Sequence, residues 1–268
     1  MFIKRILTFI FLFFLFIKIS IYSSMDMFLI FFLLISFVIF KEWGNLLELK
    51  NNFYSLYLIF VLFIFLFLLY FYKIIPGVIF IFFCFIFLLF HFLNLIYYYD
   101  FNDLMIKNYI INLFFSCFLF FPVLINLNLI SNYFTNDFFI GKMIIIYIFF
   151  LIFISDTIGY IFGKSFGKKK IFKKISPNKT YFGIISIFVV VFLLYILLYL
   201  NKIFNSFYVF LILNFIVLIS SIIGDLVISL YKRFHGSKDS GNFLPGHGGF
   251  LDRIDSSLLS FSMFLFFL

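Results

Sequence analysis

The sequence predicts an all-α polytopic integral membrane protein with eight or nine transmembrane helices. Three observations support this fold class. Of the 268 residues, 66% are hydrophobic and only 12% are charged, whereas soluble domains carry roughly 25% charged residues. The mean hydropathy is +1.23, and several apolar windows are long enough to cross a bilayer. Together these observations exclude a soluble enzyme, a disordered chain and a secreted module held by disulfides.

The apolar windows define the predicted helices along the chain. A hydrocarbon core takes about 20 apolar residues per helix. The first 18 residues resemble a signal peptide without a small-residue cleavage site, so we interpret them as part of a retained span. If every window crosses, the chain has nine helices in a single domain, residues 1–268. Five windows lack Asp, Glu, Lys and Arg: 51–72, 74–99, 108–135, 180–201 and 203–224. Four weaker windows are shorter or contain a charge: 6–24, 27–40, 137–160 and 256–268.

The net charge of +9 is concentrated in two loops. Residues 164–179 and 232–253 together hold 11 of the 20 Lys and Arg residues. Two predicted crossings separate these loops, so both loops face the same side of the membrane. The positive-inside rule makes that side cytoplasmic. In a membrane protein such cations set topology or bind anionic lipid and phosphate groups, and we expect no nucleic acid partner.

Composition divides the chain into two parts. Ten of the 13 glycines lie between residues 159 and 249, and five of the 11 acidic residues lie between 156 and 255. We therefore interpret residues 1–155 as a helical scaffold and residues 156–268 as the catalytic half of the domain. Asp156 lies at the end of a predicted span, where an acidic residue either serves function or reaches the interface for structural reasons.

Carboxylates, cations and glycines alternate through residues 224–255. Carboxylates are hard oxygen ligands suited to Mg²⁺, Lys and Arg neutralise phosphate charge, and glycines let backbone amides approach an anion closely. A solvated loop whose charges only set topology is the alternative. The density of all three residue types favours a metal-assisted phosphate site at the membrane surface.

A detailed pattern runs through this segment: Ser229-x-x-Lys232-Arg233, Lys238-Asp239-x-Gly241 and Leu244-Pro245-x-His247-Gly248-Gly249-Phe250-x-Asp252-Arg253-Ile254-Asp255. An upstream block reads Asp156-x-x-Gly159-Tyr160, Gly163-Lys164, Gly167-Lys168 and Ser176-Pro177-Asn178-Lys179-Thr180-x-x-Gly183. Glu42-Trp43 follows the second span. Together they resemble the phosphatidate cytidylyltransferases, the CDP-diacylglycerol synthases. Four residues depart from the usual pattern of that family: Asn178, Phe182, Ile228 and Tyr231.

The resemblance implies that CTP and phosphatidic acid react to give CDP-diacylglycerol and pyrophosphate. It implies a homodimer in the bilayer of a bacterial inner membrane, with a cytoplasm-facing, Mg²⁺-dependent site that has room for a second cation. Asp225 and Asp252 are the expected metal ligands, and Asp239 and Asp255 would ligate or orient the cations. The other expected catalytic or substrate-binding residues are Ser176, Lys179, Thr180, Ser229, Lys232, Arg233, Lys238, His247, Gly248, Gly249 and Arg253.

Other functions stay open at this point. A CTP-dependent kinase acting on a polyprenol or related alcohol would release CDP instead of pyrophosphate. A transporter would show buried polar residues in mid-span and symmetry between its halves, whereas the charges here lie in loops and the halves share no motif. A degenerate, inactive copy of the enzyme is a further alternative. The lysines of 168–174 either bind anionic lipid heads or only anchor topology.

Overall fold

The computed structural model describes Lys18, Tyr22 and residues 25–46, 138–173, 175–200, 207–234, 236–241, 243 and 248–266. The predicted spans 51–72, 74–99 and 108–135 lie outside the described residues, as do all of 6–24 except Lys18 and Tyr22. The number of crossings therefore stays a prediction. The described elements are α2 (Met25–Leu46), α7 (Phe138–Phe166), β1 (Lys170–Phe172), β2 (Ser176–Thr180), α8 (Tyr181–Leu200), α9 (Phe207–Phe234) and α10 (Leu251–Phe266).

Within the described residues the remaining predicted windows fall on helices, except that Thr180, the first residue of 180–201, ends β2. Two helical stretches, Met143–Phe166 in α7 and Phe210–Arg233 in α9, are long and apolar enough to cross a membrane by length and composition, and Tyr181–Leu197 in α8 is a shorter apolar helix. Helix α9 runs ten residues past the window 203–224, through Phe234. The polar last turns of α9 therefore continue the same helix beyond its apolar residues.

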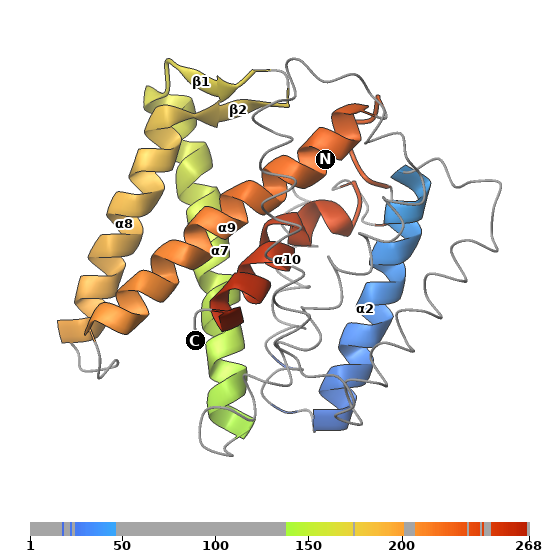
Figure 1. The fold of residues 1–268 in the computed structure, drawn as a ribbon, viewed down its shortest axis with the longest axis horizontal. Coiled ribbons are helices and arrows are strands. Elements are labelled where there is room, and N and C mark those ends of the chain that lie inside the picture. Colours follow the sequence, from blue (N-terminus) through green and yellow to red (C-terminus); the bar gives the residue numbers. More distant parts are fainter. Residues whose placement is uncertain are drawn as a thin grey trace.

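The described chain is mostly helical, but it is not all-α as predicted. Strands β1 and β2 form an antiparallel hairpin, in which Lys170 pairs with Thr180 and Phe172 with Ser176. The hairpin occupies the lysine-rich loop between α7 and α8 (Figure 1). Pro177 in β2 has no backbone N–H and disfavours helix at the preceding residue, and closely spaced lysines repel one another on a helix. The backbone of this segment instead pairs across a short turn to form the hairpin.

Helices α7 and α8 pack almost backbone to backbone. A Cβ placed on Gly183 would lie 2.7 Å from the carbonyl oxygen of Gly159 and 3.3 Å from the Cα of Gly163. Small residues at a helix contact allow this close approach. Thr180, the last residue of β2, caps α8, since its Oγ1 accepts a hydrogen bond of 3.1 Å from the amide of Gly183 in the usual manner of an N-cap. The glycines of the upstream motif therefore serve helix packing.

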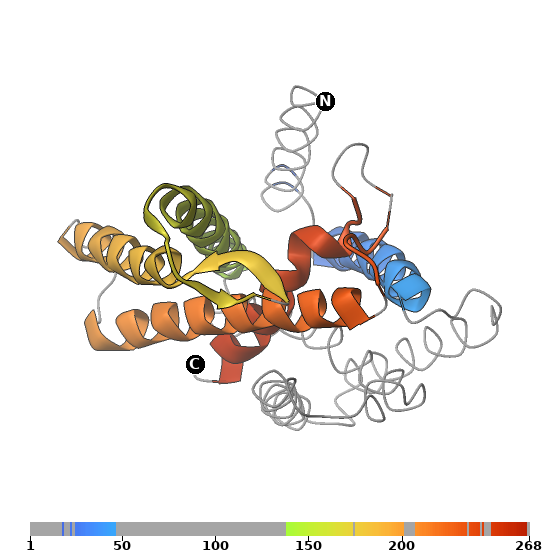
Figure 2. The ribbon, with the colours of Figure 1, turned by 90° about the horizontal axis from the view of Figure 1, so that it is seen from above.

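Helix α10 crosses α9 and lies between α9 and α2 (Figures 1 and 2). The crossing is close at Gly224, where a Cβ would lie 2.7 Å from the carbonyl oxygen of Asp255. Ser260 Oγ donates to the carbonyl of Val217 across the same contact at 3.2 Å. Leu230, Leu251 and other apolar side chains of the two helices form the buried core around it.

The chain direction places the polar segments at one end of the molecule. Helices α2, α7 and α9 end there, and α8 and α10 begin there (Figure 1). The hairpin and the segment that follows α9 consequently lie at the same end. The predicted neighbourhood of the two loops is thus present in the structure.

Candidate active site

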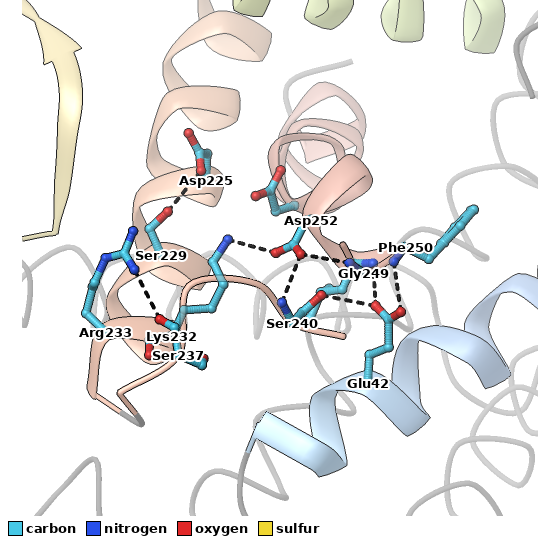
Figure 3. A network of polar contacts seen from close by, with 12 residues as sticks. Glu42, Asp225, Ser229, Lys232, Arg233, Ser237, Ser240, Gly249, Phe250 and Asp252 are labelled. Carbon is cyan, nitrogen blue, oxygen red and sulfur yellow. Dashed lines mark hydrogen bonds and ion pairs between the residues drawn. The ribbon is translucent and has the colours of Figure 1, made fainter. Parts of the chain in front are cut away.

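The last turns of α9 present a polar face. Asp225, Ser229 and Lys232 are spaced by four and three residues, which places them on one side of a helix. Ser229 Oγ donates a hydrogen bond of 3.1 Å to Asp225 Oδ1. Figure 3 shows Lys232 extending from this face toward α10. The last turns of α9 therefore place a carboxylate and a cation on one face of the helix, beyond its apolar part.

Asp252 receives three donors. Lys232 Nζ lies 2.8 Å from its Oδ1, and its Oδ2 accepts the amides of Ser240 at 2.8 Å and Gly249 at 3.0 Å. Both side chains of the Lys232–Asp252 pair are only 9% exposed. A carboxylate at the first turn of a helix is stabilised by the partial positive charge of the helix N-terminus. Asp252 is thus held by its ion pair and two backbone amides (Figure 3).

Asp225 belongs to a second, more accessible ion pair. Lys179 Nζ of β2 lies 2.7 Å from Asp225 Oδ2, with side-chain exposures of 21% and 28%. The same ammonium donates to the carbonyl oxygen of Ile222 at 3.2 Å. Arg233 Nε adds a hydrogen bond of 3.3 Å to the carbonyl of Ile175. The hairpin is therefore bound to α9 at two points, and the two predicted motif blocks meet there.

A third carboxylate, that of Asp255, lies close to these groups. It is buried, and its Oδ1 accepts the amide of Ser256 at 2.8 Å. Burial and the negative charge of Asp225 raise the pKa of the Asp255 carboxyl well above its usual range. Asp156 of α7 also faces this region, because its Oδ2 accepts the hydroxyl of Ser256 at 3.3 Å. Carboxylates from three helices thus converge on one region.

The other predicted residues divide by location. Arg233 also donates to the carbonyl of Ser237 at 3.1 Å, so both of these contacts are with backbone rather than with another predicted site residue. Thr180 is buried as the cap of α8, and Ser176 is half-buried in β2. Lys238, Asp239 and Arg253 are exposed. His247 lies outside the described residues.

Gly248 and Gly249 are positions where a side chain does not fit. Gly248 has a φ of +83°, and a Cβ there would lie 3.2 Å from both Asp239 Cγ and Asp252 Oδ2. A Cβ on Gly249 would lie 2.6 Å from a carboxylate oxygen of Glu42. The two glycines therefore let the backbone pass directly beside carboxylates, and Gly249 directs its amide to Asp252.

The family of the chain follows from comparison with known proteins. A family model described as "Cytidylyltransferase family" matches residues 3–268. The chain belongs to this family. It is 36% identical over 152 residues to the phosphatidate cytidylyltransferase of Haemophilus influenzae, covering 53% of this chain and 52% of that protein. It is 43% identical over 117 residues to the enzyme of the same name from Staphylococcus haemolyticus, covering 43% and 45%. The chain spans about half the length of the curated relatives it matches.

The carboxylates of this region are compatible with a divalent metal ion. In the part of the chain that the structure describes, no three His, Cys, Asp or Glu side chains are grouped to hold a metal by themselves. Mg²⁺ usually takes one or two carboxylates and completes its shell with water and substrate phosphate oxygens. Asp225 and Asp252, each already beside a lysine, fit that mode. Their role as ligands stays a prediction.

Sequence reasoning gave little weight to one member of this polar network, Glu42. It is only 4% exposed, and it accepts hydrogen bonds of 2.8 Å from the amides of both Phe250 and Leu251. The available signal was an acidic residue beside a tryptophan directly after the apolar window 27–40. That pattern indicates an unusual span end but does not identify the acid's partner, which lies more than 200 residues away.

Proposed function

We propose that this protein catalyses the reaction of CTP with phosphatidic acid to give CDP-diacylglycerol and pyrophosphate. The observation that carries the proposal is the buried Lys232–Asp252 pair at 2.8 Å. It brings the two halves of the C-terminal motif together beside Asp225 and Lys179. The names of the matched relatives, phosphatidate cytidylyltransferases, support the same reaction.

The chemistry requires little acid–base assistance. An oxygen of the lipid phosphate forms a bond to the α-phosphorus of CTP. The bond between that phosphorus and the oxygen that bridges the α- and β-phosphates breaks, so that pyrophosphate leaves. A phosphomonoester has a second pKa near 6, so the nucleophile is largely ionised at neutral pH. The obstacle is the approach of two polyanions. Catalysis is therefore positioning and charge neutralisation.

The described residues can supply both. Lys179 and Lys232 reach the site from different segments, β2 and α9, and each ammonium can donate to phosphate oxygens as well as to its aspartate. The Gly248–Gly249 backbone closely approaches one of these carboxylates, that of Asp252. Mg²⁺, held by Asp225 and Asp252 together with nucleotide oxygens, would neutralise phosphate charge and polarise the α-phosphate. The Asp255 carboxylate would provide a ligand for a second cation.

We further propose that the site faces the cytoplasm of a bacterial inner membrane, in a homodimeric protein with eight or nine spans. Supporting this are the positive-inside distribution of Lys and Arg and the helices long enough to cross a bilayer. The hairpin and the α9–α10 connection lie at the same end of the molecule, as a site accessible to CTP requires. Cysteine accessibility from each side of sealed vesicles, at exposed Ser165 and Lys238 replaced singly by cysteine, tests the orientation.

The reaction is tested with membranes containing the full chain, cytidine-labelled CTP and phosphatidic acid, with and without Mg²⁺. We expect lipid-soluble cytidine label that depends on Mg²⁺ and disappears in Asp252→Asn, while Asn45→Gln on the exposed side of α2 retains it. A wild-type protein that forms no CDP-lipid but phosphorylates an isoprenoid alcohol would show a CTP-dependent kinase. Label in Asp252→Asn at the wild-type level would remove Asp252 from the site.

A further inference from the structure

Helix α2 contributes a buried carboxylate to the start of α10. Glu42 lies one turn before the end of α2 and is only 4% exposed. Its Oε1 accepts the amide of Phe250 and its Oε2 accepts the amide of Leu251, both at 2.8 Å. Figure 3 shows the side chain extending from α2 directly to these amides. Burying an acid in an apolar protein is costly unless hydrogen bonds compensate, and here both carboxylate oxygens accept them.

Two carboxylates accept the amides of three consecutive residues where the chain enters α10. The first N–H groups of a helix have no partner within the helix and favour a negative charge. Gly249 donates its amide to Asp252, and the next two residues donate theirs to Glu42. Asp252 comes from α10 itself, whereas Glu42 comes from a helix more than 200 residues earlier. The amides at the entry to α10 are therefore divided between a local and a distant acid.

Ser240 connects the two carboxylates directly. Its amide donates to Asp252 Oδ2 at 2.8 Å and its hydroxyl donates to Glu42 Oε2 at 3.1 Å. A Cβ on Gly241 would lie 3.0 Å from Glu42 Oε1, so the backbone beside Ser240 also closes over the acid. Any displacement of the Glu42 carboxylate would shift Ser240, and with it one of the two amides that orient Asp252.

A neighbouring aromatic contact fixes α2 against α9. Trp43 and Tyr231 are both 2% exposed, and their ring centroids are 5.0 Å apart at an angle of 60°. Tilted aromatic pairs at this distance are favourable beyond the area they bury. Tyr231 immediately precedes Lys232, the partner of Asp252. The end of α2 is thus packed against the helix that carries one half of the ion pair and hydrogen-bonded to the segment that carries the other.

We propose that Glu42 is a positioning residue of the active site: from α2 it holds the amides of Phe250 and Leu251 and the Ser240 hydroxyl, and thereby sets the orientation of Asp252. This role does not require Glu42 to touch substrate or metal. Its catalytic consequence rests on the proposed cytidylyltransferase reaction, whereas its effect on the start of α10 does not.

The test uses the full-length protein in lipid nanodiscs and three graded variants. Glu42→Gln keeps the size but turns an NH₂ group toward a backbone donor, Glu42→Asp keeps the charge on a shorter arm, and Ser240→Ala removes only the link between the acids. Asn45→Gln, on the exposed side of the same helix, is the matched control. Hydrogen–deuterium exchange of peptides that cover Phe250 and Leu251 is measured beside kcat, both KM values and the Mg²⁺ concentration for half-maximal activity.

We expect Glu42→Gln to lower kcat about 10- to 100-fold, the effect of one lost hydrogen bond to a charged group. It should raise the Mg²⁺ concentration for half-maximal activity, accelerate exchange at the start of α10 and leave the KM for phosphatidic acid unchanged. Glu42→Asp should recover part of the loss and Ser240→Ala should show a smaller one, about threefold. Asn45→Gln should match the wild type throughout.

Wild-type exchange and wild-type kcat in Glu42→Gln would overturn the proposal. If Glu42→Gln fails to fold, as seen by loss of a single size-exclusion peak, the other two variants decide, and wild-type behaviour of both overturns it. Absence of CDP-lipid formation by the wild-type protein would refute the proposed reaction instead. In that case the exchange measurement alone still supports or overturns the role of Glu42.

Discussion

The substitution Asp252→Asn changes one atom at the centre of the polar network. In the wild-type protein the Asp252 carboxylate accepts the Lys232 ammonium on Oδ1 and two backbone amides on Oδ2. An asparagine has a single oxygen. If that oxygen serves the two amides, its NH₂ group faces the Lys232 ammonium, and if it faces the ammonium, its NH₂ group opposes two N–H donors. Neither orientation satisfies the site.

The cost can be estimated from burial. Both partners of the ion pair are 9% exposed, so water cannot replace the lost charge. Removing one member of a buried pair costs about 3–5 kcal/mol, because the other charge stays buried without compensation. The alternative orientation leaves two backbone donors unsatisfied, at about 1–3 kcal/mol each. We therefore expect Asp252→Asn to lower the free energy of unfolding by about 3–5 kcal/mol.

A double variant separates stability from catalysis. Adding Lys232→Met removes the buried ammonium, so the double variant should regain most of the lost stability and still form no CDP-lipid. Thermal unfolding in one detergent, followed by tryptophan fluorescence from Trp43, and the labelled-CTP assay measure the two quantities. A double variant no more stable than Asp252→Asn would refute the reasoning about the buried charge. Stability of Asp252→Asn equal to the wild type would refute the network itself.

Three further predictions concern contacts around this centre. Lys179→Met removes the partly exposed pair with Asp225, so we expect about 1 kcal/mol of lost stability but a much larger loss of CDP-lipid formation; equal and small effects on both would contradict a catalytic role. Gly183→Ala forces a methyl group against the Gly159 carbonyl and should cost about 1–3 kcal/mol in thermal unfolding, and an unchanged midpoint would argue against the backbone contact. Gly248→Ala places a Cβ in the left-handed region beside two aspartates and should cost at least about 1 kcal/mol, together with most of the activity in the labelled-CTP assay; wild-type values for both would show that the turn tolerates a side chain.

Much of the site was visible in the sequence because its residues are local. The C-terminal pattern names Ser229, Lys232 and Asp252 within one short stretch of the chain, and Asp225 lies just before it. Their pairing was not predictable. It depends on where α9 and α10 cross, which is decided by the absence of a side chain at Gly224, and no local pattern specifies that contact.

Other residues have different or additional roles because their chemistry suits two tasks. Thr180 was predicted to bind substrate; in the structure its hydroxyl caps α8, a role that Thr also favours. The lysine-rich loop forms a hairpin although its residues do not alternate between apolar and polar as strands usually do. Glu42 received little weight because its partners, Ser240 and the first amides of α10, are distant in sequence.

The contact between α2 and α10 also determines when the site can assemble during protein synthesis. Residues Glu42 and Phe250 are 208 positions apart, so a ribosome working at about 5–20 residues per second needs roughly 10–40 s to pass from one to the other. Throughout that interval the acid on α2 has been synthesised but its amide partners have not. The proposed active site is therefore completed only when the last described helix emerges, and a nascent chain stopped before α10 would carry most of the apolar protein but lack Asp252 altogether.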